Sequence, residues 1–109
     1  NKIEHLNNYT FAHLDKLVNL DLNNNKINKI EMQTFYGNLL SLNFLGLQMN
    51  NINNFPIKIF SQLKNLKRIF LMNNYVEILK NEYFDGLDNL ENLNLANSKL
   101  ATIESYSLK

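Results

Sequence analysis

Apolar residues in the stretch LVNLDLNNNKI, residues 17 to 27, follow neither of the two simple periods of secondary structure. Leu17, Leu20, Leu22 and Ile27 are separated by three, two and five positions, and asparagines fill most of the gaps. An amphipathic helix would repeat about every 3.6 residues and a half-buried strand about every two. No single regular element accounts for this stretch, so its structure has to be inferred from a longer part of the chain.

The same pattern returns three more times, which indicates an internal repeat. It has the form L-x-x-L-x-L-x-x-N-x-I-x-x-I, and its copies start at residues 17, 42, 66 and 90, separated by 25, 24 and 24 residues. The three full copies also carry a later phenylalanine and leucine, at Phe35 and Leu39, Phe60 and Leu63, and Phe84 and Leu87. We therefore divide the chain into a partial repeat at 1–16, repeats at 17–41, 42–65 and 66–89, and an incomplete last repeat at 90–109.

This pattern resembles the leucine-rich repeat family, in the 24-residue type found in Toll-like receptor ectodomains and other extracellular proteins. The resemblance covers the whole chain. It implies one domain, residues 1–109, of the α/β class: a right-handed solenoid forming part of a horseshoe. A parallel sheet of short strands is expected on the concave face, and irregular or short helical turns on the convex face. Alternating leucines of each strand point inward, and no coil buries its apolar face without its neighbours. The spacing in the opening stretch is then that of one closed coil.

Asn25, Asn50 and Asn74 stand where each strand gives way to a turn. The resemblance implies that these side chains lie inside the coil as an asparagine ladder, bonded to backbone groups of their own and the adjacent repeat. Buried backbone groups in a turn need such partners, so we predict a structural role for all three. Ser98 takes this position in the last repeat, and its shorter side chain predicts a weaker turn.

The outward positions of the predicted strands form the candidate binding surface. Five of them combine apolar and cationic side chains on neighbouring strands and are predicted to bind a partner: Phe44, Met49, Arg68, Phe70 and Met72. Aromatic residues, methionine and arginine are enriched in protein interfaces, and exposed apolar clusters call for a reason. We also expect Gly46 to leave a dip between Phe44 and Phe70 that a partner residue can enter. The alternative is that these are scattered exposed apolar residues, as any protein has.

Composition and charge exclude several classes of function. The net charge is only +1, so no global field attracts nucleic acid or an anionic membrane. Cysteine is absent, which removes thiolate catalysis and cysteine-based zinc sites. His5 and His13 stand without a ligand cluster, and the acidic residues are scattered, so we predict no enzyme, no metal and no cofactor. The longest apolar runs have about four residues, far from the roughly 20 that cross a bilayer, and no direct membrane insertion is expected.

Lys64, Lys67, Arg68 and Phe70 combine charge with an aromatic ring, as in single-strand nucleic-acid sites. On a nearly neutral chain, a solvated rim is the favoured interpretation, and we predict no nucleic-acid partner. Asn8-Tyr9-Thr10 is a sequon and makes Asn8 a candidate glycosylation site. In a chain with 22 asparagines one such triplet is expected by chance, so it does not indicate secretion.

The first and last repeats are incomplete and lack polar caps, which solenoids normally need. We therefore expect a fragment of a longer array, or uncapped ends that self-associate with another copy. Taken with the resemblance, the prediction is a non-catalytic protein-recognition module of an extracellular receptor, adhesion or innate-immune signalling protein, located outside the cell or at its surface. The alternative is a structural spacer whose repeats contact no ligand of their own.

Overall fold

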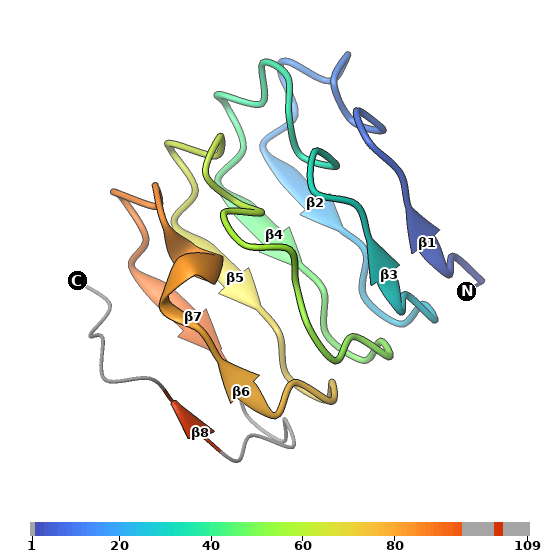
Figure 1. Cartoon of the computed structure of the whole chain (residues 1–109). Helices are drawn as coiled ribbons and strands as arrows, with labels where there is room; N and C mark the ends of the chain where they lie inside the picture. The colour runs from blue at the N-terminus through green and yellow to red at the C-terminus, as the bar shows by residue number, and fades with distance from the viewer. Residues whose placement is uncertain (1, 95–101, 104–109) are drawn as a thin grey trace.

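The computed structural model describes residues 2–94 and 102–103 as a stack of coils built from short strands (Figure 1). In chain order the elements are β1 (His5–Leu6), β2 (Asn19–Asp21), β3 (Lys29–Ile30), β4 (Phe44–Gly46), β5 (Arg68–Phe70), β6 (Ile78–Leu79), the 3-10 helix η1 (Asn81–Phe84), β7 (Asn92–Asn94) and β8 (Thr102–Ile103). Between them the chain forms turns, because each coil changes direction every few residues to close on itself.

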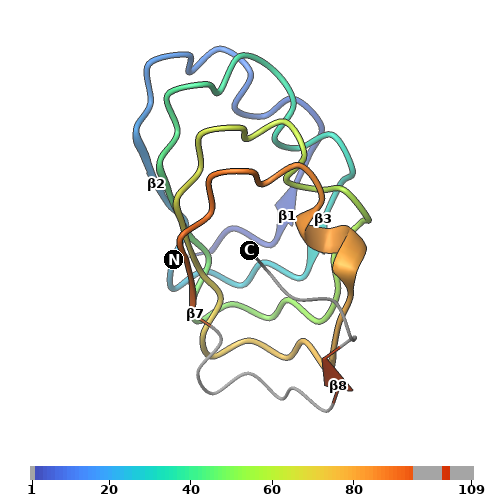
Figure 2. The same ribbon diagram turned by 90° about the vertical axis from the view of Figure 1, so that its left-hand side faces the viewer.

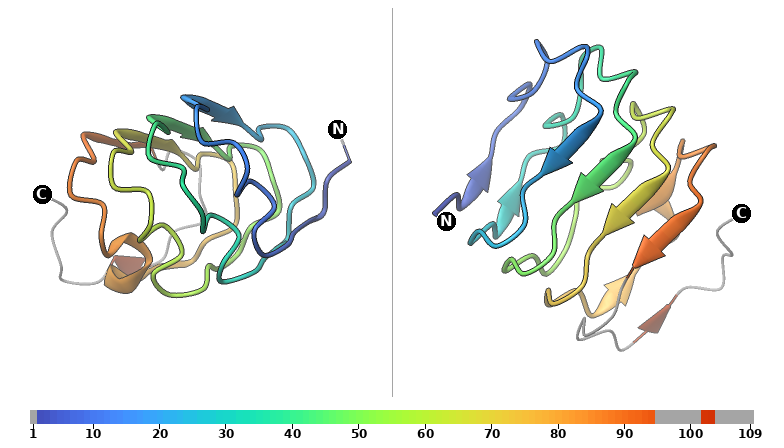
Figure 3. Two further views of the ribbon diagram at one scale, coloured as in Figure 1. Left: turned by 90° about the horizontal axis from the view of Figure 1, so that it is seen from above. Right: turned by 180° about the vertical axis from the view of Figure 1, so that it is seen from behind.

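The main sheet contains one three-residue strand from each of four successive coils, in the order β2-β4-β5-β7. All its pairs are parallel, and the register aligns Leu20, Leu45, Ile69 and Leu93 across the sheet. These pairings join residues 25, 24 and 24 positions apart, the separations of the sequence pattern. The strands run side by side in the rear view (Figure 3, right).

Two smaller parallel pairs, β1 with β3 and β6 with β8, line the opposite side of the coils. A view nearly along the stack shows the main sheet on one side and these outer pairs on the other (Figure 2). The predicted helical turns reduce, in the described ranges, to the single helix η1. Within those same ranges no helix is long and apolar enough to cross a membrane.

The core fills the space between the two sides and consists of the repeated apolar positions. In one coil, the fully buried side chains include Leu45, Leu47, Ile52, Phe60 and Leu63. Four phenylalanines at one repeat position form a row through the stack: Phe11, Phe35, Phe60 and Phe84. The predicted leucine-rich repeat solenoid is confirmed. Ser98, and with it the predicted weak turn, lies outside the described residues.

Candidate protein-binding face

The structure brings Phe44 and Phe70 together on the outer surface of the main sheet. In β4 and β5 the inward residues, Leu45 and Ile69, are fully buried, while both phenylalanines remain half-buried. Their ring centroids lie 4.9 Å apart with planes at 88°, an edge-to-face arrangement. Phe70 is paired with Gly46 and not with Phe44, so the rings meet diagonally across the two strands. The side chains form an aromatic pair on the face of the sheet and are not part of the leucine core.

The predicted dip at Gly46 is wrong, because a neighbouring side chain covers this glycine. Gly46 is buried, and a Cβ atom placed on it would lie 2.7 Å from Oδ1 of Asn23. That Oδ1 accepts a hydrogen bond of 2.9 Å from the backbone N–H of Gln48. Gly46 therefore allows Asn23 to reach across from the preceding coil, and the space is not open to a partner.

Met49 and Met72 extend the surface beyond the ends of the strands. Met49 lies in the turn after β4, is 49% exposed and has a backbone φ of 57°. Met72 is half-buried in the corresponding part of the next coil. Arg68, at the start of β5, is exposed and forms no salt bridge with any residue that the structure describes. We call Phe44, Met49, Arg68, Phe70 and Met72 the concave patch.

The interior asparagines, which are Asn25, Asn50 and Asn74, connect successive coils through side-chain hydrogen bonds. Asn50 is 3% exposed; its Nδ2 donates to the carbonyls of Leu22 (3.0 Å), Leu47 (3.0 Å) and Gln48 (3.2 Å). Its Oδ1 accepts from the N–H of Ile27 at 3.1 Å. One side chain thus serves backbone groups of its own coil and of the preceding one.

Asn74 and Asn25 make similar bonds one coil later and one coil earlier. Asn74 Nδ2 donates to the carbonyls of Leu47 and Leu71, and its Oδ1 accepts from Ile52 N–H. Asn25 is less buried: it donates to its own coil, to Leu22 O, and accepts from Ile3 N–H at 3.2 Å. All of these bonds join the asparagine side chains to backbone groups of the same or an adjacent coil.

Two further asparagines also connect neighbouring coils, and this role was not predicted. Asn65 Nδ2 donates to the carbonyl of Leu40 at 2.7 Å, and Asn89 Nδ2 donates to the carbonyl of Lys64 at 2.8 Å. Both residues directly precede the first leucine of a repeat, at Asn65-Leu66 and Asn89-Leu90. The recurring Asn-Leu pair is visible in the sequence, but two copies cannot be distinguished from chance in a chain with so many asparagines.

The sequon asparagine also links two coils. Asn8 is exposed, its Oδ1 accepts from Gln33 N–H, and its own N–H donates to Glu31 Oε1, both at 2.8 Å. Glycosylation at Asn8 remains a prediction. His5 and His13 are exposed, and within the described residues no group of three potential metal ligands occurs.

Comparisons with known proteins agree on one family. A family model described as a BspA type leucine rich repeat region matches residues 1–109 in six copies. Keratocan from Bos taurus is 32% identical over 103 residues, covering 93% of this chain and 28% of keratocan. Toll-like receptor 4 from Bos taurus is 40% identical over 60 residues, covering 54% of this chain and 7% of the receptor. A crystal structure of a TLR13–ssRNA13 complex superposes with a TM-score of 0.63 at 26% identity, covering 90% of this chain and 18% of that one.

These relatives are extracellular, cell-surface or endosomal leucine-rich repeat proteins, in agreement with the predicted localisation. Leucine-rich repeat proteins of this kind are generally non-catalytic receptor or matrix proteins. The chain spans well under a third of the length of each relative described above. Because the family model matches every residue and the fold is the repeated coil that the family shares, the chain belongs to the leucine-rich repeat family.

Proposed function

We propose that the chain is a non-catalytic recognition segment of an extracellular receptor, adhesion or innate-immune protein, and that it contacts a protein partner through the concave patch. The observation that carries this proposal is the half-buried pair of Phe44 and Phe70 on the face of the main sheet. Apolar rings left facing solvent are a cost to an isolated domain unless something covers them.

The residues around this pair have the composition of an interface centre. Met49 supplies a flexible apolar side chain, and Arg68 supplies an exposed guanidinium without an ion pair among the described residues. Aromatic residues, methionine and arginine are the types enriched at such centres. The backbone beneath them is held by the parallel ladder, so little conformational entropy is lost when a partner binds.

The size of the sheet sets a limit on what this segment binds alone. Four strands at about 4.8 Å spacing give a width of roughly 14 Å. A standard interface buries roughly 800 Å² on each partner, so it needs most of this sheet or continues beyond it. The concave patch is therefore best understood as the centre of a larger contact.

The test replaces both phenylalanines. Phe44→Ser with Phe70→Ser should weaken partner binding by roughly 30-fold or more, the effect of losing a central hot spot. The matched control is Met32→Ser with Ile57→Ser, which removes two exposed apolar side chains outside the concave patch and should leave affinity unchanged. Binding is measured by surface plasmon resonance, with circular dichroism to show that both variants are folded. Unchanged affinity in the Phe44/Phe70 variant would support the spacer alternative.

A second candidate function is contact with single-stranded RNA. The TLR13 structure is a complex with ssRNA, and here Lys67 and Arg68 are both exposed beside Phe70. The net charge of +1 provides little general attraction for a polyanion. If RNA is the ligand, binding of a single-stranded RNA oligonucleotide should fall steeply with salt and weaken in Lys67→Ala with Arg68→Ala. Binding that is insensitive to salt would favour the protein partner.

A further inference from the structure

The outer ladder of strands is interrupted in the middle of the stack. Between β1 and β3 the backbone N–H groups of Asn28 and Glu31 donate to the carbonyls of Glu4 and Leu6, each at 2.9 Å. At the corresponding place between the next coils, no backbone hydrogen bond joins residues 53–57 to any other described residue. Pro56 occupies the position of Glu31 and has no N–H to continue the ladder.

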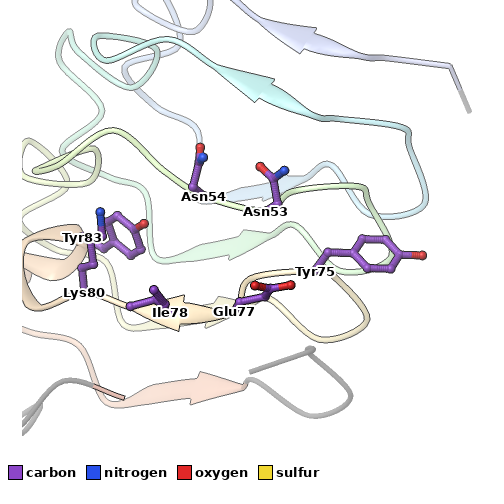
Figure 4. Close-up of a pocket in the computed structure, with 7 residues that line it drawn as sticks. All are labelled: Asn53, Asn54, Tyr75, Glu77, Ile78, Lys80 and Tyr83. Carbon is purple, nitrogen blue, oxygen red and sulfur yellow. The ribbon is translucent and has the colours of Figure 1, made fainter. Parts of the chain in front are cut away.

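Backbone pairing between residues 52–58 and the following coil is made only at the two ends of this segment. Tyr75 N–H donates to Ile52 O at 2.9 Å before the interruption, and Lys58 N–H donates to Glu82 O at 2.7 Å after it. Between these two bonds lies a pocket of about 440 Å³. It is lined by Asn53, Asn54, Tyr75, Glu77, Ile78, Lys80 and Tyr83. In the close-up, the two asparagines come from one coil, and Glu77 and Ile78 come from the neighbouring coil (Figure 4).

Tyr83 brings a phenol hydroxyl to this pocket. The residue is only 2% exposed, and its ring packs on Phe55 with centroids 5.4 Å apart. Figure 4 shows its hydroxyl directed toward the pocket, and no described residue forms a hydrogen bond with it. Thr34, at the corresponding position of an earlier coil, is also buried, but its Oγ1 donates to backbone carbonyls at 2.7 and 3.1 Å. No buried side-chain oxygen among the described residues lacks a hydrogen-bond partner, so the Tyr83 hydroxyl is reached by solvent and can donate to or accept from a ligand in the pocket.

The remaining lining groups define the chemistry of a ligand. Asn53 and Asn54 offer amide donors and acceptors, and both are exposed. Glu77 and Lys80 carry opposite charges and form no salt bridge among the described residues, so a ligand of either charge would meet a like charge. Tyr75 and Ile78, 49% and 47% exposed, provide apolar surface.

From this combination we infer that the pocket binds a neutral saccharide of one or two units. Its hydroxyl groups both donate and accept hydrogen bonds, as the phenol, amides and carboxylate require, and its C–H faces can pack on Tyr75 and Ile78. The volume lies within the range of roughly 300–1,000 Å³ that is usual for small-molecule sites. This site is separate from the concave patch, because it lies among the outer strands, and it does not depend on the proposed function.

The test is a titration of the protein with galactose, mannose, N-acetylglucosamine and lactose, followed by amide chemical shifts. At least one sugar should shift the amides of Asn53, Asn54 and Tyr75 at roughly millimolar concentration. Tyr83→Phe removes only the hydroxyl and should weaken that binding about fivefold, the effect of one net hydrogen bond. Tyr36→Phe is the matched control, since this ring contacts Tyr9 away from the pocket, and it should leave sugar affinity unchanged.

Asn53→Ala with Asn54→Ala provides a second variant in case Tyr83→Phe perturbs the aromatic packing. These side chains are exposed, so their removal should lower sugar affinity without altering the fold. The inference is overturned if none of the sugars shifts these amides, or if both variants bind sugar as well as the unchanged protein. It is also overturned if inorganic phosphate or glycine binds here in place of every sugar, since that would indicate a charged ligand.

Discussion

One residue of the concave patch has an unfavourable backbone conformation. The turn after each of three strands of the main sheet holds a residue in the left-handed region: Asn24 at φ 59°, Met49 at 57° and Asn73 at 60°. The Cβ of any side chain is crowded in this region, and asparagine tolerates it because its short polar side chain can hydrogen-bond to the local backbone, which methionine cannot do. Strained residues persist where the surrounding structure or a function retains them, so the methionine at this turn agrees with a contact role.

Met49→Asn should therefore stabilise the fold while weakening partner binding. The free energy of unfolding should rise by about 1 kcal/mol, because the new residue suits the left-handed turn. Urea denaturation measures this change, and Asn73→Met is the reciprocal control, with a loss of similar size expected. A Met49→Asn protein that is less stable than the original would show that packing of the methionine outweighs its backbone strain.

At the scale of the repeated elements, the interior asparagines hold one coil to the next. Asn50→Ala removes all of its bonds at once and leaves the buried Ile27 N–H without its acceptor. The carbonyls of Leu22 and Leu47 each lose one donor and keep the bonds from Asn25 and Asn74. We expect a loss of about 1–3 kcal/mol in the free energy of unfolding, the cost of one buried N–H group left without a hydrogen bond. Asn25→Ala should cost less, because Asn25 is half-buried and water can replace it. Equal losses in the two variants, measured by urea denaturation, would contradict this account.

The strands of the main sheet and the interior asparagines were predictable because they recur at a fixed period with a distinct chemical signature. The outer pairs, β1 with β3 and β6 with β8, were not predicted as strands, since two-residue segments carry no detectable alternation. The contact of Gly46 with Asn23 could not be found either. It depends on how far a side chain reaches across coils, and the repeat pattern does not encode this.

The same distinction applies to the two candidate sites. Placing Phe44, Arg68 and Phe70 on the outer face followed from alternation about buried leucines, and the structure has all three there. The repeat register placed them on adjacent strands, but a dip was expected between Phe44 and Phe70, and the contact of the two rings was not predicted. The pocket at Tyr83 lies beside residues 53–57, which lack the backbone bonds of the outer ladder, and it contains a tyrosine where an earlier coil has Thr34. Residues that depart from the repeat pattern can be recognised in the sequence. Whether a pocket forms beside them depends on how the surrounding coils pack, which the pattern does not specify.

At the scale of the whole molecule, stability depends on rows of side chains that pass from coil to coil. The phenylalanines at residues 11, 35, 60 and 84 pack in series, with ring centroids 5.8, 5.8 and 6.2 Å apart. Phe60 is fully buried between two neighbours of this row, whereas Phe11 has one such neighbour and is 9% exposed. In a solenoid the coils are stabilised by the interfaces with their neighbours, so a central residue supports two interfaces.

Phe60→Ala should therefore cost about 3–5 kcal/mol, the range for deleting a buried aromatic ring, and Phe11→Ala distinctly less. The central substitution should also broaden the denaturation curve, because it weakens the coupling between the coils on its two sides. Urea titrations followed in parallel by circular dichroism and by tyrosine fluorescence measure both effects. If both probes report the same sharp transition in Phe60→Ala, the backbone ladders and the asparagines are enough to make the coils unfold together. The row of phenylalanines would then add stability without coupling the unfolding of one coil to that of the next.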